Sequence, residues 1–280
     1  MYDSHFNEPP DKPPETMYKY TSFERAFDIL TNGKIYFAKP SEFNDPYDGR
    51  VTLDLDTLEK RKNFMEHLER KYGTDIMSTK EKQEFIDNQS KADNHVRAIM
   101  KGWRKIDTTG FCCLTDTRHS LPMWAHYADN HKGCCLMLDF SKHSNQKSLE
   151  DDFPFHCINK IEYQLNLPKY NMDSTDSAWR YYIYKSCEWK YENEWRAVMF
   201  SKHTLRGRSR YSLHKESNGA GCYLLGDFLC GVILGYRMAK AAKKKIQVAA
   251  RQRGISVQQA SPKLYKYGIH LDKVDSKQPS

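Results

Sequence analysis

Near the start of the chain, the spacing of hydrophobic residues changes from that of a strand to that of a helix. A first strand begins at Met17. Thr21-Ser22-Phe23-Glu24 then has the form of a capping box, in which a hydroxyl and a carboxylate satisfy backbone amides at a helix start. The apolar residues of this helix are Phe23, Ala26, Phe27 and Leu30. We expect the helix to end at Gly33 and residues 34–38 to form a short strand that Pro40 ends.

Polar helical stretches and short apolar runs follow. Residues 57–71 and 80–105 have helical patterns with few apolar anchors, so the region 57–105 is expected to be a helical insertion that covers a sheet. Strands are predicted at residues 110–114, 134–140, 157–163, 194–200, 229–234, 255–259 and 264–270, and helices after Ser120, at 179–184 and at 238–253. This mixture predicts a single α+β domain over residues 17–272, with flexible tails at 1–16 and 273–280.

The composition is that of a folded protein without a membrane segment. Hydrophobic residues make up 39% of the 280 residues and aromatic residues 13%, which supplies material for a core. No apolar run approaches the ~20 residues that cross a bilayer, and residues 1–16 lack the apolar stretch of a signal peptide. A cytoplasmic location is therefore expected.

The eight cysteines lie mostly within apolar runs, and none belongs to a Cys-x-x-Cys pair. The adjacent pairs Cys112-Cys113 and Cys134-Cys135 would each place one thiol on either face of a strand. Reduced core thiols are predicted, and no metal site is expected.

Positive charge is in excess over the whole chain. Lys and Arg number 44 against 36 Asp and Glu, which gives a formal net charge of +8. The basic residues concentrate at 202–210 and 240–253. This excess suits a partner that carries phosphates, but it does not distinguish RNA, DNA and a nucleotide cofactor.

The segment most suggestive of chemistry is Trp189-Lys190-Tyr191-Glu192-Asn193-Glu194-Trp195-Arg196. In an extended conformation, Glu192, Glu194 and Arg196 share one face of the strand. Burying two carboxylates beside a guanidinium is costly unless the groups bind a ligand or pair with one another. Two interpretations stay open: a binding site, or an ion pair of Glu194 with Arg196 or with a neighbouring strand.

Two other segments combine polar and aromatic residues. Asn44-Asp45-Pro46 predicts a turn, because Asn and Asp bond their own backbone and proline fixes the entry angle. Tyr47 beside this turn allows a ring-stacking role as well as a purely structural one. Trp124 and Tyr127 lie on one side of the predicted short helix, where core packing explains most of the pattern.

The chain contains no Gly-rich dinucleotide motif, Walker loop, Gly-x-Ser-x-Gly elbow or His-Glu-x-x-His motif. Instead it resembles a bacterial family, domain-of-unknown-function family 2971. The segments that carry this resemblance are residues 18–22, 34–40, 43–46, 123–127, 130–133, 189–196 and 232–235. The family name conveys no activity, although a toxin or antiphage role would suit it.

A second resemblance points to chemistry. A strand with an aromatic-polar-Tyr-Thr motif, a helix that ends in Asn-Gly, and Ile-Tyr-Phe-Ala before a tyrosine-bearing loop are similar to the NAD-binding core of ADP-ribosyltransferases. The resemblance implies a split, mainly antiparallel β core. It also implies that Lys19 holds the NAD ribose, that Tyr36 and Tyr47 stack on nicotinamide, and that Glu194, or else Glu192, holds the nicotinamide ribose.

This resemblance predicts a glycosyltransferase that uses NAD to modify a macromolecule, with nucleic acid favoured over protein. The expected catalytic residues are Glu194, Glu192 and Lys19. The residues expected to bind NAD are Tyr20, Thr21, Tyr36, Asn44, Asp45, Tyr47, Trp124, Tyr127 and Arg196. A carboxylate near the breaking nicotinamide–ribose bond would favour the positive charge that develops on the sugar.

Two alternatives stay open. In a metal-dependent nuclease or other phosphoryl-transfer enzyme, Mg²⁺ would be bound by Asp45, Asp48, Glu192 and Glu194, and the basic run 202–210 would hold phosphates. In a non-catalytic nucleotide- or protein-binding module, recognition would use the aromatic residues Trp124, Tyr127, Trp189 and Trp195. The aromatic surroundings of the acids favour ring stacking over a hydrated metal.

Overall fold

The computed structural model describes residues 13–50, 52, 55–94, 109–141, 157–169, 182–200 and 220–274. These residues fall into two compact units. The described residues of unit 1 lie within Pro40–Asp107 and Glu162–Cys187, and those of unit 2 lie within Phe6–Lys39, Thr108–Ile161 and Glu188–Ser280. The chain therefore leaves unit 2 twice, whereas the sequence predicts one domain with one insertion. The basic run 202–210 and most of both predicted tails lie outside the described residues.

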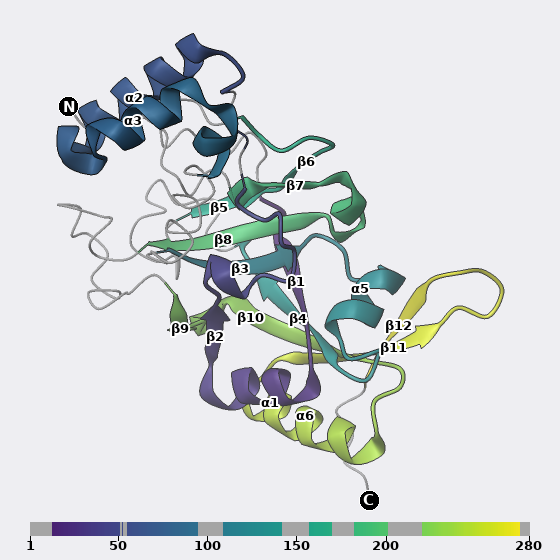
Figure 1. Cartoon of the computed structure of the whole chain (residues 1–280). Coiled ribbons are helices and arrows are strands. Elements are labelled where there is room, and N and C mark those ends of the chain that lie inside the picture. Colours follow the sequence, from purple (N-terminus) through teal and green to yellow (C-terminus); the bar gives the residue numbers. More distant parts are fainter. Residues whose placement is uncertain are drawn as a thin grey trace, which may run out of the picture. The chain divides into compact units, whose positions relative to one another are not determined.

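Unit 2 is built on a sheet of eight strands in the order β12-β11-β10-β4-β1-β3-β8-β5 (Figure 1). The strands are β1 (Thr16–Thr21), β3 (Thr109–Thr115), β4 (Cys134–Asp139), β5 (Cys157–Lys160), β8 (Glu194–Phe200), β10 (Leu229–Leu234), β11 (Ser256–Pro262) and β12 (Ile269–Lys273). Strands β10 and β11 pair in parallel, and the other neighbouring pairs of this sheet are antiparallel. The predicted α+β class with a mainly antiparallel sheet is confirmed.

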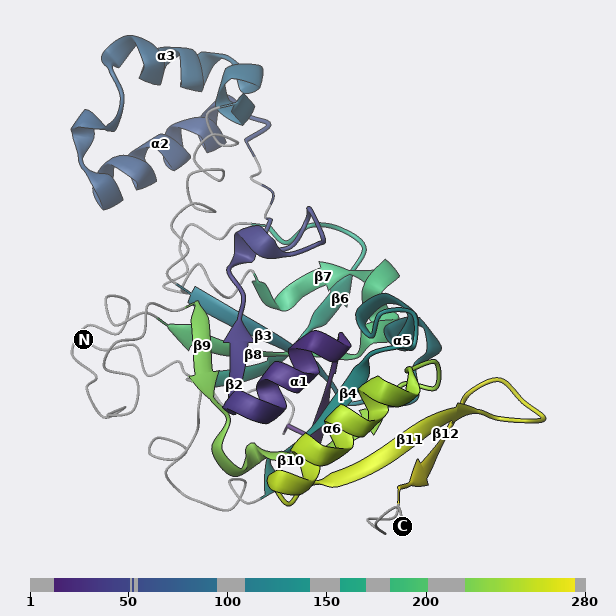
Figure 2. The same ribbon diagram turned by 90° about the horizontal axis from the view of Figure 1, so that it is seen from below.

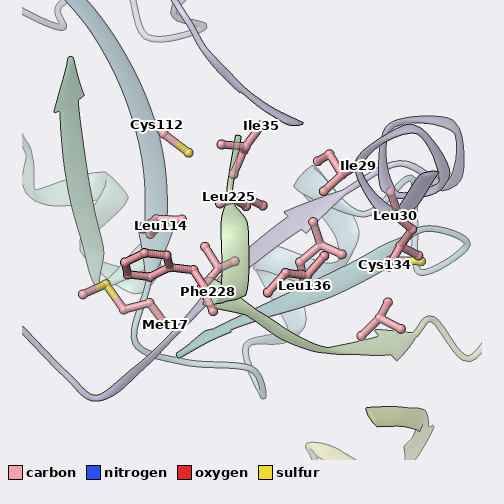
Figure 3. Close-up of a cluster of buried hydrophobic side chains, with 14 of the residues drawn as sticks. Met17, Ile29, Leu30, Ile35, Cys112, Leu114, Cys134, Leu136, Leu225 and Phe228 are labelled. Atoms are coloured by element: carbon pink, nitrogen blue, oxygen red, sulfur yellow. The ribbon is translucent and has the colours of Figure 1, made fainter. Parts of the chain in front are cut away.

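One face of the sheet carries the larger hydrophobic core of unit 2 (Figure 3). Helices α1 (Phe23–Asn32) and α6 (Lys240–Gln252) cover this face and lie side by side, as Figures 1 and 2 show. The helices contribute Ile29, Leu30, Ile246, Ala249 and Ala250 to this core. Each fully buried Leu or Ile side chain stabilises the fold by about 1.5–3 kcal/mol, so this face anchors the unit.

Helix α1 lies where the sequence predicts it. Its N-cap is Ser22, whose hydroxyl accepts a hydrogen bond from the backbone amide of Arg25, so the cap is one residue later than the predicted Thr21. Gly33 ends the helix with φ 70°, a left-handed conformation that glycine adopts without strain. Strand β2 (Lys34–Phe37) follows and pairs with β9 (Gly221–Leu224) in a separate two-stranded sheet.

The opposite face of the eight-stranded sheet carries the smaller core of unit 2, which α5 (Leu121–Tyr127) covers. Its buried residues are Tyr18, Tyr20, Met123, Trp124, Ala128, Cys135, Ile233, Ala260 and Ile269. The short 3-10 helix η5 (Cys187–Glu192) precedes β8, and η7 (Gly226–Phe228) precedes β10. The predicted strand at 264–270 is displaced, because β12 begins only at Ile269.

Unit 1 contains η1 (Pro40–Glu42), α2 (Leu58–Tyr72), η2 (Thr74–Ile76), α3 (Thr79–Asp87) and the parallel strands β6 (Glu162–Gln164) and β7 (Tyr184–Ser186). Helices α2 and α3 fall within the predicted helical insertion. They pack through the stacked rings of Phe64 and Phe85, whose centroids lie 6.0 Å apart. The helix predicted at 179–184 is wrong at its end, since Tyr184 begins β7.

The described residues also bear on the predictions about a membrane segment and about the cysteines. No helix among them is long and apolar enough to cross a membrane. Cys112, Cys134 and Cys135 are buried free thiols, in agreement with the prediction of reduced core cysteines.

Candidate functional site

Strand β8 places two charged residues on the face that α5 covers. The larger core takes Trp195, Ala197 and Met199 from this strand. Because side chains alternate along a strand, Glu194 and Arg196 lie on the opposite face. Their cross-strand neighbours on β3 are Thr115, opposite Glu194, and Cys113, opposite Arg196. The predicted common face of Glu194 and Arg196 is therefore confirmed.

Glu194 and Arg196 form a buried ion pair. The Arg196 Nε atom donates to Glu194 Oε1 at 2.6 Å, and Nη2 donates to Oε2 at 3.1 Å. Their side chains are 3% and 1% exposed. Burial, followed by the negative charge of Glu194, raises the pKa of the neighbouring Cys113 thiol, so this cysteine stays protonated. The ion-pair interpretation of the sequence holds for Glu194 and Arg196.

Glu192 does not belong to the strand. It is the last residue of the 3-10 helix η5, and β8 begins at Glu194. Between them Asn193 has φ 44°, in the left-handed region that Asn adopts more readily than most residues. The predicted extended face shared by Glu192, Glu194 and Arg196 is therefore wrong for Glu192, because the chain turns at Asn193.

Two hydroxyl groups hold Glu192 in place. The Tyr127 hydroxyl donates to Glu192 Oε1 at 2.6 Å, and the Thr115 hydroxyl donates to the Glu192 backbone oxygen at 2.6 Å. Glu192 is 3% exposed and Thr115 is 1% exposed. A further contact, 3.2 Å from the Tyr191 hydroxyl to His126 Nδ1, links η5 to α5. Tyr127 of α5 thus orients the carboxylate of Glu192, and Thr115 of β3 holds its backbone.

The start and end of helix α5 set the position of Tyr127. The Ser120 hydroxyl caps the helix by accepting from the Met123 amide, and Pro122 in the first turn suits a helix start. After the helix, residues 129–131 (Asp129, Asn130 and His131) have φ of 45°, 51° and 67°. The helix ends at Tyr127 with Ala128 as its C-cap, and this left-handed run then turns the chain back toward β4.

Trp124 and Tyr20 are core residues of this face. Trp124 is 0% exposed, and its Nε1 donates to the Arg118 carbonyl oxygen at 3.0 Å. Its ring meets that of Tyr20 edge to face, with centroids 5.1 Å apart. The Tyr20 hydroxyl donates to the Thr117 carbonyl oxygen at 3.1 Å. Neither ring presents an open face for NAD in this structure.

Lys19 lies on the other side of the sheet from Glu194. It alternates with its neighbours on β1, so it shares a face with Met17 of the larger core. Its Nζ donates to the Cys113 backbone oxygen at 3.1 Å. The predicted joint NAD site of Lys19 and Glu194 is not formed, since the sheet separates them.

Tyr36 and Thr21 also lie away from the acids. Strand β2 buries Ile35 and Phe37 in the larger core, so Tyr36 points outward and is 41% exposed. Thr21 is 5% exposed and lies opposite Cys134 of the larger core. Neither residue shares the face of Glu194 and Arg196.

The remaining predicted NAD contacts belong to unit 1. Asp45 and Asp48 are each 2% exposed, and Asp45 Oδ1 accepts from the Tyr47 amide at 2.8 Å, which confirms the predicted turn. Tyr47 is 55% exposed, with the Arg50 guanidinium 5.3 Å from its ring centroid. Asn44 is exposed. Contacts of Asn44, Asp45 and Tyr47 with NAD stay predictions.

Thr115 and the turn at Asn193 were not among the residues predicted from the sequence. The sequence did contain a signal for Thr115, which directly follows the apolar run 110–114. Because Leu114 belongs to the larger core, the next residue of the strand faces away from that core. Within the described ranges, no three His, Cys, Asp or Glu side chains come together as a possible metal site. The four acids of the predicted magnesium site are divided between the units, Asp45 and Asp48 in unit 1 and the two glutamates in unit 2.

The comparisons with known proteins bear on this region. The model of a family described as "Protein of unknown function (DUF2971)" matches residues 123–197. This match supports the family resemblance seen in the sequence, and it spans α5, β4, η5 and the start of β8. No curated protein and no solved structure matches the chain. The matched segment contains both members of the Tyr127–Glu192 hydrogen bond.

Proposed function

We propose that unit 2 holds the reaction centre of an NAD-consuming enzyme of the ADP-ribosyltransferase type, a glycosyltransferase with NAD as substrate. The observation that carries this proposal is the 2.6 Å hydrogen bond from Tyr127 to Glu192, beside the buried Glu194–Arg196 pair. The succession of β1, α1 and β2 adds support, because the resemblance to the NAD-binding core rests on that order.

The proposed step breaks the bond between the nicotinamide nitrogen and C1′ of the ribose. The bonding electron pair leaves with neutral nicotinamide, and positive charge develops on the sugar. The acceptor nucleophile then forms the new bond at C1′ and loses its proton. A preorganised carboxylate beside the sugar stabilises this charge more than it stabilises the bound substrate, so the reaction accelerates.

We assign this electrostatic role to Glu192, although the sequence ranks Glu194 first. Both oxygens of Glu194 accept from Arg196, and the guanidinium offsets the charge of that carboxylate. The hydroxyl of Tyr127 is a neutral donor, and it orients one carboxylate oxygen of Glu192. Glu194 and Arg196 then act as positioning residues for the turn at Asn193. Lys19 and Tyr36 have no part in this centre.

The acceptor proposed is a macromolecule, and the formal net charge of +8 favours nucleic acid over protein. A toxin or antiphage role would follow from the modification of such a target.

The test is release of nicotinamide from labelled NAD by the purified full chain, with protein, DNA and RNA offered as acceptors. Glu192→Gln keeps the shape of the side chain and removes its charge, and it should slow release about a hundred- to thousandfold. Tyr127→Phe removes the orienting hydroxyl and should slow release about tenfold or more. The matched control is Glu188→Gln, an exposed glutamate in the same 3-10 helix, which should leave the rate unchanged.

Thermal melts of each variant show whether the fold is kept. An NAD pool that wild-type protein leaves intact with every acceptor would overturn the proposal. So would equal rates for wild type and a folded Glu192→Gln variant. Cleavage of nucleic acid that stops in EDTA, with NAD untouched, would favour phosphoryl transfer instead.

A further inference from the structure

Strands β11 and β12 form an antiparallel hairpin at one edge of the unit 2 sheet. Its tip extends away from the other strands of unit 2 in both ribbon views (yellow in Figures 1 and 2). The last paired residues of the two strands are Pro262 and Ile269. The Lys263 amide then donates to the Gly268 carbonyl oxygen at 3.0 Å, which closes the turn. Residues 264–267 therefore form the tip.

The base of this hairpin is anchored in the smaller core. Ala260 and Ile269 are each 1% exposed and belong to that core. His119 Nδ1 lies 3.2 Å from the Ile269 carbonyl oxygen, and Ser261 donates to Asp272 Oδ2 at 3.2 Å across the strands. The tip is thus presented from a fixed base.

The tip itself carries aromatic and basic side chains with almost no protein contact. Leu264 is 87% exposed, Tyr265 98% and Tyr267 99%. Scattered exposed apolar residues are normal on a protein surface, but three within one turn at such exposure point to a partner. Lys263 and Lys266 alternate with them, and residues 263–268 include no acid.

We propose that this tip binds single-stranded nucleic acid, with Tyr265 and Tyr267 stacking on bases and Lys263 and Lys266 contacting phosphates. Every base has a face on which a tyrosine ring stacks, and alternating aromatic and cationic side chains are typical of surfaces that bind single strands. The positive tip complements the phosphate backbone. A lipid surface is less favoured, because Leu264 is the one aliphatic side chain of the tip. The inference names the macromolecular partner of the proposed enzyme, and in that sense it rests on the proposed function.

The test is fluorescence anisotropy of a labelled 12-nucleotide oligo-uridine with the full chain, in the absence of NAD, so that binding and catalysis fail separately. Tyr265→Ala/Tyr267→Ala should weaken binding by about 5- to 150-fold for each base that stacks, without changing the salt dependence. Lys263→Ala/Lys266→Ala should reduce the slope of log K against log salt by about 1.4, since each phosphate contact contributes about 0.7 for single strands. A duplex of the same sequence should bind more weakly than the single strand.

Matched controls lie elsewhere in unit 2. Lys244→Ala/Lys245→Ala on α6 removes the same charge from another exposed basic surface, and Leu224→Ala removes another exposed apolar side chain. Both controls should bind like wild type. The proposal would be overturned if the tip lysine variant and the α6 lysine control lost oligo-uridine affinity equally. It would also be overturned if the tyrosine variant lost no affinity. The proposal would also be overturned if the tip variants lost binding to phosphatidylserine vesicles but bound oligo-uridine like wild type.

Discussion

Replacement of Arg196 by methionine isolates the buried ion pair of β8. The Arg196 side chain is 1% exposed, and it donates to Glu194 at 2.6 Å and 3.1 Å. Methionine retains much of the apolar volume and removes the charge. The main change is therefore that the carboxylate of Glu194, whose side chain is 3% exposed, loses this guanidinium.

The magnitude follows from the geometry. Two hydrogen bonds to a charged group contribute about 1.5–3 kcal/mol each, and the removal of one partner of a buried ion pair costs about 3–5 kcal/mol. A typical domain has an unfolding free energy of about 5–15 kcal/mol, so Arg196→Met should lose a large fraction of the total. Glu194→Met/Arg196→Met removes both charges of the pair, and replacement of a whole buried pair by apolar residues is often neutral. The double variant should therefore recover most of the loss.

The measurement is urea unfolding followed by tryptophan fluorescence, because Trp195 lies between the two residues and is 2% exposed. The single variants, the double variant and wild type complete a double-mutant cycle. A shift in midpoint at constant m-value reports stability alone. A cost below about 1 kcal/mol for Arg196→Met, with no recovery in the double variant, would refute the buried pair.

Three further changes test the surroundings of the site. Thr115→Val keeps the shape of the side chain but leaves the Glu192 backbone oxygen without this donor, and it should lower the urea midpoint by an amount equivalent to about 1–3 kcal/mol. Gly235→Ala would place a Cβ atom 2.2 Å from the His131 carbonyl oxygen. Circular dichroism melts should therefore show that the variant loses about 3 kcal/mol or more of its unfolding free energy. Burial, and then Arg237, lowers the pKa of His131 from its ordinary 6.5, so the native state binds fewer protons than the unfolded chain and stability should fall as pH drops below 6.5. His131→Asn, which suits the left-handed φ of 67°, should weaken that pH dependence in melts at pH 7.5 and 5.5, and an undiminished dependence would contradict this assignment.

The parts of the fold that could be predicted from sequence are those with local chemical signals. Helix α1 has a hydroxyl cap at Ser22 and a left-handed stop at Gly33, and both act within one turn of the helix. The strand predicted at 264–270 failed because Tyr265, Tyr267 and Ile269 alternate as in a strand. Only Ile269 reaches the core, since the chain turns before it. Alternation alone does not separate a strand from an exposed hairpin tip.

In the candidate site, alternation likewise does not always tell on which face of the sheet a residue lies. In β8, one large apolar residue, Trp195, identifies the core side, and Glu194 and Arg196 follow on the other side by alternation. In β1, apolar and aromatic residues occupy both faces, so alternation does not tell which face Lys19 shares. The pairing of Lys19 with Leu136 of β4 decides it, and that contact joins segments far apart in the sequence. A ligand that touched both Lys19 and Glu194 from one side would have to pass through the sheet. A reaction centre in unit 2 is therefore better built from residues that meet at η5 and α5, where Glu192 and Tyr127 are in direct contact.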